Sequence, residues 1–172
     1  MKKLNLLFIA LAMVLTACSS DDTNPPNTEG DLLGTWIGQD VQYTGTSATE
    51  VQGQSITADF VGDAYDVNYT LTFTENPNEV VADGSYSIEL TTTALGQSQT
   101  QNVEDLEFLN SGTWSRSGNQ LSITDNGETT VGTIVELTVN TLKIAVTETE
   151  DVVEQGISAS SNIDIEMTYT RM

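Results

Sequence analysis

The stretch VNYTLTFT, residues 67–74, decides the fold class, because apolar and polar side chains alternate along it without a break. A period of two puts neighbouring side chains on opposite faces of a β-strand, so that one face is buried and the other meets water. Valine, tyrosine and threonine also suit the pleated, half-buried surface of a sheet. The stretch therefore predicts a strand with Val67, Tyr69, Leu71 and Phe73 on its buried face.

The same alternation recurs on both sides of this stretch, and short turn signals separate the segments. The alternating segments are residues 86–90, 121–123, 131–139, 142–146 and 163–169. The turn signals are NPN at 76–78, DG at 83–84, SGN at 117–119, DNG at 125–127 and VNT at 139–141. Asn-Gly and Asp-Gly tolerate positive φ and suit tight hairpins. We therefore expect an all-β protein, an antiparallel up-and-down barrel of about 8–10 strands, with a β-sandwich as the alternative.

The first strand, in LLGTWIGQDVQY at residues 32–43, has a conflict of parity. Trp36 shares a face with Gly34 and Gly38, whereas Val41 and Tyr43 fall on the other face. Either a β-bulge near Gly38 resets the register or the second set faces outward. The polar residues 45–54 that follow are expected to form a long loop at the open end of the barrel, where a ligand would enter.

Composition excludes several kinds of chemistry. The chain of 172 residues has 5 Lys and Arg against 25 Asp and Glu, no His and one Cys. Without His there is no Ser-His or Cys-His nucleophile and no His-bound zinc, and a net charge of −20 repels nucleic acid. Most acids lie in solvent-facing positions, so we expect no catalytic residue and no cofactor. Asp59, Asp63 and Asp66 could offer oxygens to calcium, but a polar connection between strands is the favoured interpretation, and no metal site is predicted.

The N-terminus, MKKLNLLFIALAMVLTACSS at residues 1–20, has the pattern of a secretory signal peptide. Its apolar run is about half of the ~20 residues that a membrane-spanning helix needs. LTAC at residues 15–18 resembles the lipobox of bacterial lipoproteins, in which the Cys receives acyl chains such as palmitate and becomes the new N-terminus. We therefore expect a signal peptide at 1–17, lipid attachment at Cys18, a flexible tether at 18–30 and a β-barrel domain at 31–172.

The residues after Cys18 suggest a location. Ser19 and Ser20 followed by Asp21 and Asp22 resemble sorting to the outer membrane and export to the cell surface, with a plain solvated linker as the alternative. Removal of residues 1–17 leaves three bases against 25 acids, a net charge of −22. Such charge is repelled by anionic membranes, so the lipid is expected to hold the protein at the bacterial outer membrane or cell surface.

Four short motifs resemble bacterial lipocalin-like domains carried by lipoproteins. They are LLGTW at 32–36, GTWSRSGNQL at 112–121, VNTLKI at 139–144 and MTYTR at 167–171. The resemblance covers residues 32–172 and implies a barrel that holds a small ligand. It also implies that Arg171 packs across the Trp36 ring as a cation–π contact at the barrel base, with a terminal surface charge as the alternative.

The apolar faces supply the candidates for a ligand cavity, and the same residues would also make a packed core. They are Trp36, Val67, Tyr69, Phe73, Tyr86, Ile88, Phe108, Trp114 and Tyr169. The tyrosines are the more suggestive members, because a buried phenol needs a polar partner that a ligand could supply. We expect a monomeric, non-catalytic protein, held at the membrane by its N-terminal lipid, whose barrel binds a small apolar molecule. The alternative is a structural or interaction module of the cell envelope.

Overall fold

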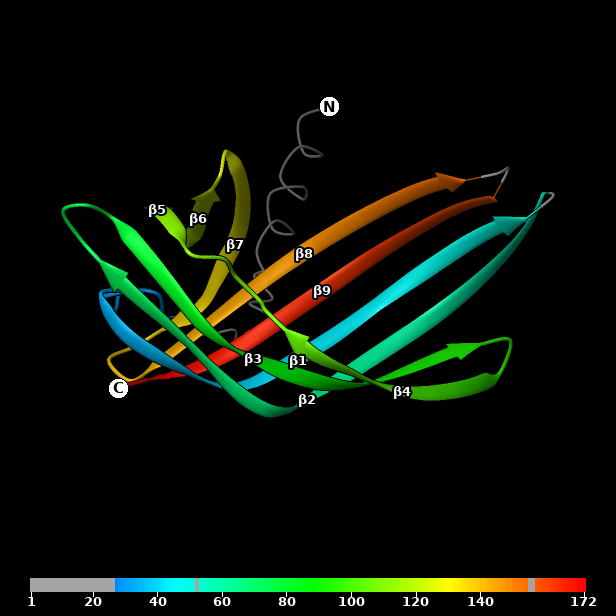
Figure 1. Ribbon diagram of the computed structural model, residues 1–172, viewed down its shortest axis with the longest axis horizontal. Helices are drawn as coiled ribbons and strands as arrows, with labels where there is room; N and C mark the ends of the chain where they lie inside the picture. The colour runs from blue at the N-terminus through cyan, green and yellow to red at the C-terminus, as the bar shows by residue number, and fades with distance from the viewer. Residues whose placement is uncertain (1–26, 52, 155–156) are drawn as a thin grey trace, which may run out of the picture.

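The computed structural model describes residues 27–51, 53–154 and 157–172. The expected signal peptide, Cys18 and most of the expected tether lie outside these residues. The described part is built from nine strands in antiparallel pairs, and it contains no helix long and apolar enough to cross a membrane. The strands are β1 (Gly34–Val51), β2 (Gln54–Thr74), β3 (Glu79–Ala94), β4 (Gln97–Leu106), β5 (Gly112–Ser117), β6 (Gln120–Asp125), β7 (Glu128–Leu137), β8 (Thr141–Glu154) and β9 (Ile157–Arg171) (Figure 1).

Eight of the nine strands form a hydrogen-bonded ring. The strand order is β2-β1-β9-β8-β7-β6-β5-β3-β4, and β2 also pairs with β3, which closes the ring and leaves β4 as an extra strand beside β3. The closure between β3 and β5 is short, with Glu79 opposite Thr113 and Val80 opposite Gly112. The expected all-β, antiparallel fold is confirmed, and both a barrel and a sandwich are consistent with this ring.

The ring is closed at one end and split along the other half. β4 has β3 as its only strand partner among the described residues, and β8 pairs with β7 only as far as Ala145, although it follows β9 along its whole length. The second half is therefore an open, curved sheet in the order β4-β3-β2-β1-β9-β8, with β4 and β8 as its free edges (Figure 1). We call its inner, concave face the trough. β1 and β2 are long enough, at 18 and 21 residues, to run from the closed end into the trough.

The hydrophobic core fills the closed end. Trp36, Leu71, Leu142 and Tyr169 are each 0% exposed there. Trp36 donates from Nε1 to the Leu32 carbonyl at 2.8 Å, and the Arg171 guanidinium carbon lies 4.2 Å from the centre of the Trp36 ring. Arg171 therefore lies over Trp36 as a cation–π pair, a geometry that the resemblance implied.

A β-bulge resolves the parity conflict of the first strand. The register between β1 and β9 shifts between Gly38 and Asp40, and both Trp36 and Val41 are completely buried. Of the two alternatives, the bulge near Gly38 is therefore the correct one. Beyond it, Tyr43 lies on the inner face and packs against the core.

Two predictions about loops are wrong. Of residues 45–54, expected as a loop, residues 45–51 and 54 belong to the ends of β1 and β2, which pair with each other as far as Val51 and Gln54. The sequence hides these strands because neither of their faces is packed in a core, so no apolar alternation marks them, while their Thr and Ser residues still suit a sheet. The Asp83-Gly84 turn signal lies inside β3, where Gly84 has φ +91° and faces a bulge of β2.

The end of the expected tether also differs from the prediction. The Asn27 carbonyl accepts a hydrogen bond from the Leu137 backbone at 2.7 Å, and the Gly30 backbone donates to the Leu137 carbonyl at 3.1 Å. Arg116 donates to the carbonyls of Thr28 and Gly30. Residues 27–30 are therefore fixed to the closed end, because their backbone groups find partners at the end of β7 and on Arg116.

Candidate ligand-binding site

The predicted site residues divide between the closed end and the inner end of the trough. Trp36 and Phe73 are fully buried at the closed end, and Trp114 packs edge-on against Phe73 with ring centres 5.7 Å apart. Trp114 also donates from Nε1 to the Thr74 carbonyl at 2.9 Å. Phe73 and Trp114 thus pack on each other, and all three aromatic residues belong to the core of the closed end or pack against it. Of the other predicted residues, Tyr69, Tyr86, Ile88 and Tyr169 are buried, and Val67 and Phe108 are partly buried against the core.

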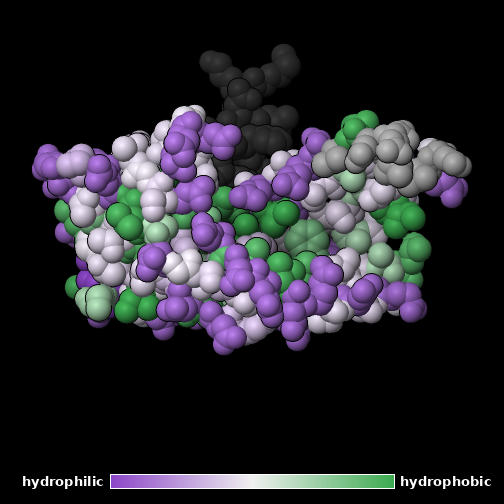
Figure 2. Space-filling model, viewed as in Figure 1, coloured by the Kyte–Doolittle hydropathy of each residue, from purple (hydrophilic) through white to green (hydrophobic). Residues whose placement is uncertain are grey.

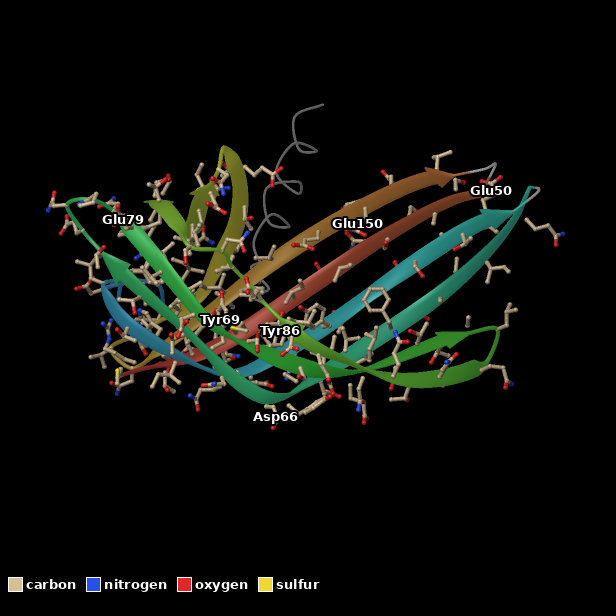
Figure 3. The ribbon with its side chains drawn as sticks, viewed as in Figure 1. Glu50, Asp66, Tyr69, Glu79, Tyr86 and Glu150 are labelled. Carbon is tan, nitrogen blue, oxygen red and sulfur yellow. The ribbon has the colours of Figure 1, made fainter. Side chains whose placement is uncertain are left out.

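Four tyrosines gather where the closed end meets the trough, and we call them the tyrosine cluster: Tyr43, Tyr69, Tyr86 and Tyr169. The ring of Tyr86 lies 6.4 Å from that of Tyr43 and 6.4 Å from that of Tyr69, the latter in an edge-on arrangement. The hydroxyls of Tyr43 and Tyr86 are hydrogen-bonded to each other. Figure 3 shows Tyr69 and Tyr86 side by side near the middle of the molecule. Sequence reasoning missed Tyr43 as a site residue, and its signal was the bulge at Gly38, which turns this side chain inward.

The connection between β4 and β5, residues 107–111, lies against the tyrosine cluster, and we call it the strap. The Tyr69 hydroxyl donates to the Leu109 carbonyl and accepts from the Leu109 backbone N–H at 3.0 Å. The Leu109 side chain is 3% exposed, and Ser111 Oγ accepts from the Ala82 backbone at 2.9 Å. The strap, which carries the predicted Phe108, is thus fixed at both Leu109 and Ser111. Figure 1 shows its course from β4 to β5. Leu109 was not predicted, because a single apolar residue in a connection has no period.

Tyr169 is the exception in the cluster. Its side chain is completely buried, and its hydroxyl has no hydrogen-bond partner in the structure. A buried hydroxyl without a partner is costly to keep, so this group calls for an explanation, and a contact with a bound molecule is one such explanation. This orphaned group is the strongest chemical signal that the interior provides.

Burial keeps the hydroxyls of the cluster protonated. It raises the pKa of Tyr69 to about 12, against a hydrogen bond from the strap that acts in the opposite direction. Burial likewise raises the pKa of Tyr43, Tyr86 and Tyr169, and the charge of Glu148 adds to the effect for Tyr43 and Tyr86. At neutral pH the cluster therefore presents neutral hydroxyls, which both donate and accept hydrogen bonds.

Beyond the cluster, the trough has an apolar surface that the protein itself covers only in part. Leu90, Val103 and Ile163 are partly buried against the core, and Phe60 lies over Gly45 of the neighbouring strand, where a Cβ would collide with its ring. Gly62 lies opposite Tyr43, and a Cβ there would come within 3.1 Å of the Cβ of Tyr43. In the space-filling view a band of apolar side chains crosses the middle of the molecule between polar rims (Figure 2).

The free edges of the trough are polar. At one edge, register and alternation put the side chains of Gln97, Gln99 and Gln101 of β4 on the inner face of the trough. At the other edge, they put the side chains of Glu148 and Glu150 of β8 on the same inner face. Both glutamates are exposed. The sequence did not predict that these polar side chains line the trough. The acids of β8 were missed because acids next to apolar positions were interpreted as facing solvent.

Hollows on the outer, convex face have a different character. Two of them, of about 300 and 190 Å³, lie over the ends of β1, β8 and β9 and are lined mainly by small residues and hydroxyl side chains. On β2, Asp59 and Asp63 lie on this outer face, and Asp66 is exposed in the bulge. Among the residues that the structure describes, no three His, Cys, Asp or Glu side chains converge as metal ligands would. The trough and its tyrosine cluster are therefore the candidate site.

Comparison with known proteins gives one match. Residues 32–144 match a family model described as a lipocalin-like domain, from the residues before β1 to the middle of β8. No curated protein and no solved structure matches the chain. The matched segment covers well over half of the chain and includes Tyr43, Tyr69 and Tyr86 as well as the strap.

Proposed function

Since the chain belongs to the lipocalin-like domain family, we propose that it binds a small apolar molecule in the trough, against the tyrosine cluster, without catalysing a reaction. The observation that carries this proposal is the contrast between the two halves of the barrel. Apolar side chains pack on one another at the closed end, whereas Phe60, Leu90, Val103 and Ile163 of the trough remain partly exposed. The tyrosine cluster, with the orphaned hydroxyl of Tyr169, lies between these two regions.

The expected affinity follows from area. A ligand that buries about 250 Å² of apolar surface would gain roughly 6 kcal/mol at 25 cal/mol per Å². The loss of motional freedom on binding offsets part of this gain, while hydrogen bonds to the cluster add to it. Since 6 kcal/mol corresponds to a dissociation constant of roughly 40 μM, we expect values of tens to hundreds of micromolar.

The test is a titration of the purified protein with N-phenyl-1-naphthylamine, a neutral dye that fluoresces in apolar surroundings. We expect saturable binding that is weakened at least about tenfold in the variant Leu90→Gln/Ile163→Gln, because both side chains line the trough. The matched control is Val61→Gln/Val81→Gln, which also replaces two aliphatic side chains by glutamine, but at positions that are 51% and 53% exposed on the outer face. Equal binding by the two variants would place the dye outside the trough.

We further propose that Cys18 carries a lipid that holds the protein at the cell envelope. The lipobox at residues 15–18 and the net charge of −22 after residue 17 support this, because an acidic domain needs an anchor other than charge. Cys18→Ala should abolish both labelling by palmitate and sedimentation with membranes. Sedimentation of the variant with membranes would contradict the proposal, whereas binding of the dye should be the same with and without the lipid.

A further inference from the structure

We propose that the ligand of the trough is an apolar molecule with a positively charged nitrogen, held near Glu148 and the tyrosine cluster. The inference rests on the proposed function and names the chemical class of the ligand. It also excludes the carboxylate-bearing chains of fatty acids as preferred ligands. Three features of the trough carry it: the sign of its charges, the absence of bases, and the aromatic groups beside the acids.

The acidic side of the trough is formed by β8. In its register with β9, Val146 lies opposite Ile165, Glu148 opposite Ile163, and Glu150 opposite Ser161. Since Val146 and Ile165 are buried on the inner face, alternation puts Glu148 and Glu150 on that face too. Glu148 also lies close enough to the cluster for its charge to raise the pKa of Tyr43 and Tyr86. Figure 3 shows Glu150 on β8, at a distance from the labelled Tyr69 and Tyr86.

No base compensates these acids. The three bases after residue 17 are Arg116, Lys143 and Arg171. Arg116 donates to the Gly118 carbonyl at 2.8 Å, Arg171 covers Trp36, and Lys143 pairs with Glu166 at 3.2 Å. All three belong to the closed end or its outer face. Within the described chain neither Glu148 nor Glu150 forms an ion pair, so a ligand carboxylate would meet only repulsion in the trough.

The aromatic groups favour the same class of ligand. A cation is attracted to the face of a tyrosine ring, and partial removal from water strengthens that attraction. Tyr43 is only partly buried, and its hydroxyl bonds to that of Tyr86. The orphaned Tyr169 hydroxyl lies close enough to Tyr69 and Tyr86 for them to influence its pKa. A nitrogen cation near Tyr43 would thus contact both an aromatic ring and Glu148, while its apolar part follows Phe60 and Leu90.

The test compares three probes that share one chain and differ in the head group: decyltrimethylammonium, decanol and decanoate. Calorimetric titration of the full protein should give the tightest binding for the ammonium and the weakest for decanoate, with at least about a tenfold difference between these two. In Glu148→Gln/Glu150→Gln the difference should fall below about threefold, with decanol unchanged. The control Asp59→Asn/Asp63→Asn removes the same number of charges from the outer face and should keep the preference.

Each result decides a different question. Binding of decanoate as tight as that of the ammonium would overturn the inference and leave the proposed function standing. Failure of all three probes to bind would overturn the proposed function itself. An equal loss of preference in the Asp59→Asn/Asp63→Asn control would show that the overall charge of the protein, and not Glu148 with Glu150, selects the ligand, which also overturns the inference.

Discussion

Two buried phenols of the tyrosine cluster differ in what their hydroxyls contact, and the difference predicts opposite effects of one substitution. Tyr69→Phe leaves the backbone N–H and C=O of Leu109 without their partner, so we expect the free energy of unfolding to fall by about 1–3 kcal/mol. Tyr169→Phe removes a buried hydroxyl that has no partner, so we expect no loss and a gain of up to about 1 kcal/mol. Urea unfolding of the ligand-free protein measures both.

Equal destabilisation by the two substitutions would contradict this account of the cluster. A second measurement separates stability from binding. If the orphaned hydroxyl is used by a ligand, Tyr169→Phe should weaken that ligand while it leaves the unfolding midpoint of the free protein unchanged or raised. Few substitutions have this combination of effects, because most changes in a core weaken both properties.

At the scale of single residues, the sequence predicted the closed end better than the trough. The resemblance implied the contact of Arg171 with Trp36. The parity of the first strand left two alternatives, a bulge near Gly38 or an outward-facing set with Val41 and Tyr43. Tyr43 and Leu109 were missed for a physical reason. The position of a bulge depends on the register with two neighbouring strands, and a strap residue has no neighbours in sequence that repeat its environment.

At the scale of single strands, β-bulges determine where the register between neighbours shifts. Between Tyr65 and Asn68 the register of β2 against β3 changes, with Asp66 at φ +52°. Gly84 sits opposite this bulge with φ +91°, and a Cβ there would collide with the Asn68 carbonyl oxygen. Only glycine fits, because the position combines a left-handed backbone with a close approach of another strand.

We therefore expect Gly84→Ala to lower the free energy of unfolding by about 3 kcal/mol or more, through strain and backbone displacement together. The control is Gly127→Ala in the β6–β7 turn, which has the same φ of +91° and nothing within 4 Å of the added Cβ. It should cost about 1 kcal/mol, from backbone strain alone. Thermal or urea unfolding distinguishes them, and equal losses would mean that the collision at Asn68 is relieved without cost.

β7 shows why alternation alone cannot fix which residues of a strand face inward. The pattern of residues 131–139 favoured Val131 and Leu137 on one face, yet Val131 is 46% exposed and Ile134 is completely buried. A register shift between Ile134 and Glu136 reconciles Ile134 with Leu137 on the inner face. When both faces of a strand carry β-branched residues, the packing partners decide its orientation, and these are not visible in the sequence of the strand.

The whole molecule should lose stability steeply at alkaline pH. Below pH 10 the tyrosines are protonated in both the folded and the unfolded protein, so their burial adds no pH dependence. Between pH 10 and 12 the unfolded chain loses the Tyr69 proton while the folded protein, in which that pKa is raised to about 12, retains it. The unfolded state then binds fewer protons, and the free energy of unfolding falls by roughly 3 kcal/mol from Tyr69 alone. The buried Tyr169 adds to this fall, since its pKa is also raised.

Urea unfolding at several pH values measures this slope. Tyr69→Phe/Tyr169→Phe should flatten this slope above pH 10, because phenylalanine has no proton to lose. At pH 7–9 the stability of the variant should differ from that of the natural protein only by an offset that does not depend on pH. A slope that is identical in the double variant would assign the alkaline loss to other groups, such as the repulsion among the 25 acids.

The two halves of the barrel should also differ in local stability, and hydrogen exchange would show it. At the closed end, Leu142, Ile144 and Met167 are completely buried between neighbouring strands, so the amides around them should exchange only on global unfolding. Residues 44–51, 54–60 and 147–154 belong to the open half, where exposed side chains predominate and β8 has a free edge. Their amides should exchange through local opening, many times faster.

The change in hydrogen exchange on binding then shows where the ligand lies. Occupation of the trough by the decyl ammonium probe should slow exchange in the open half several-fold, because the strands must open to release it, and should leave the closed end unchanged. Slowing confined to the closed end would place the probe inside the packed core and would contradict the assignment of the trough. Slowing spread evenly over both halves would indicate stabilisation of the whole fold with no preferred site. Only a change limited to the open half supports a barrel whose closed end holds the fold together while its split half binds the ligand.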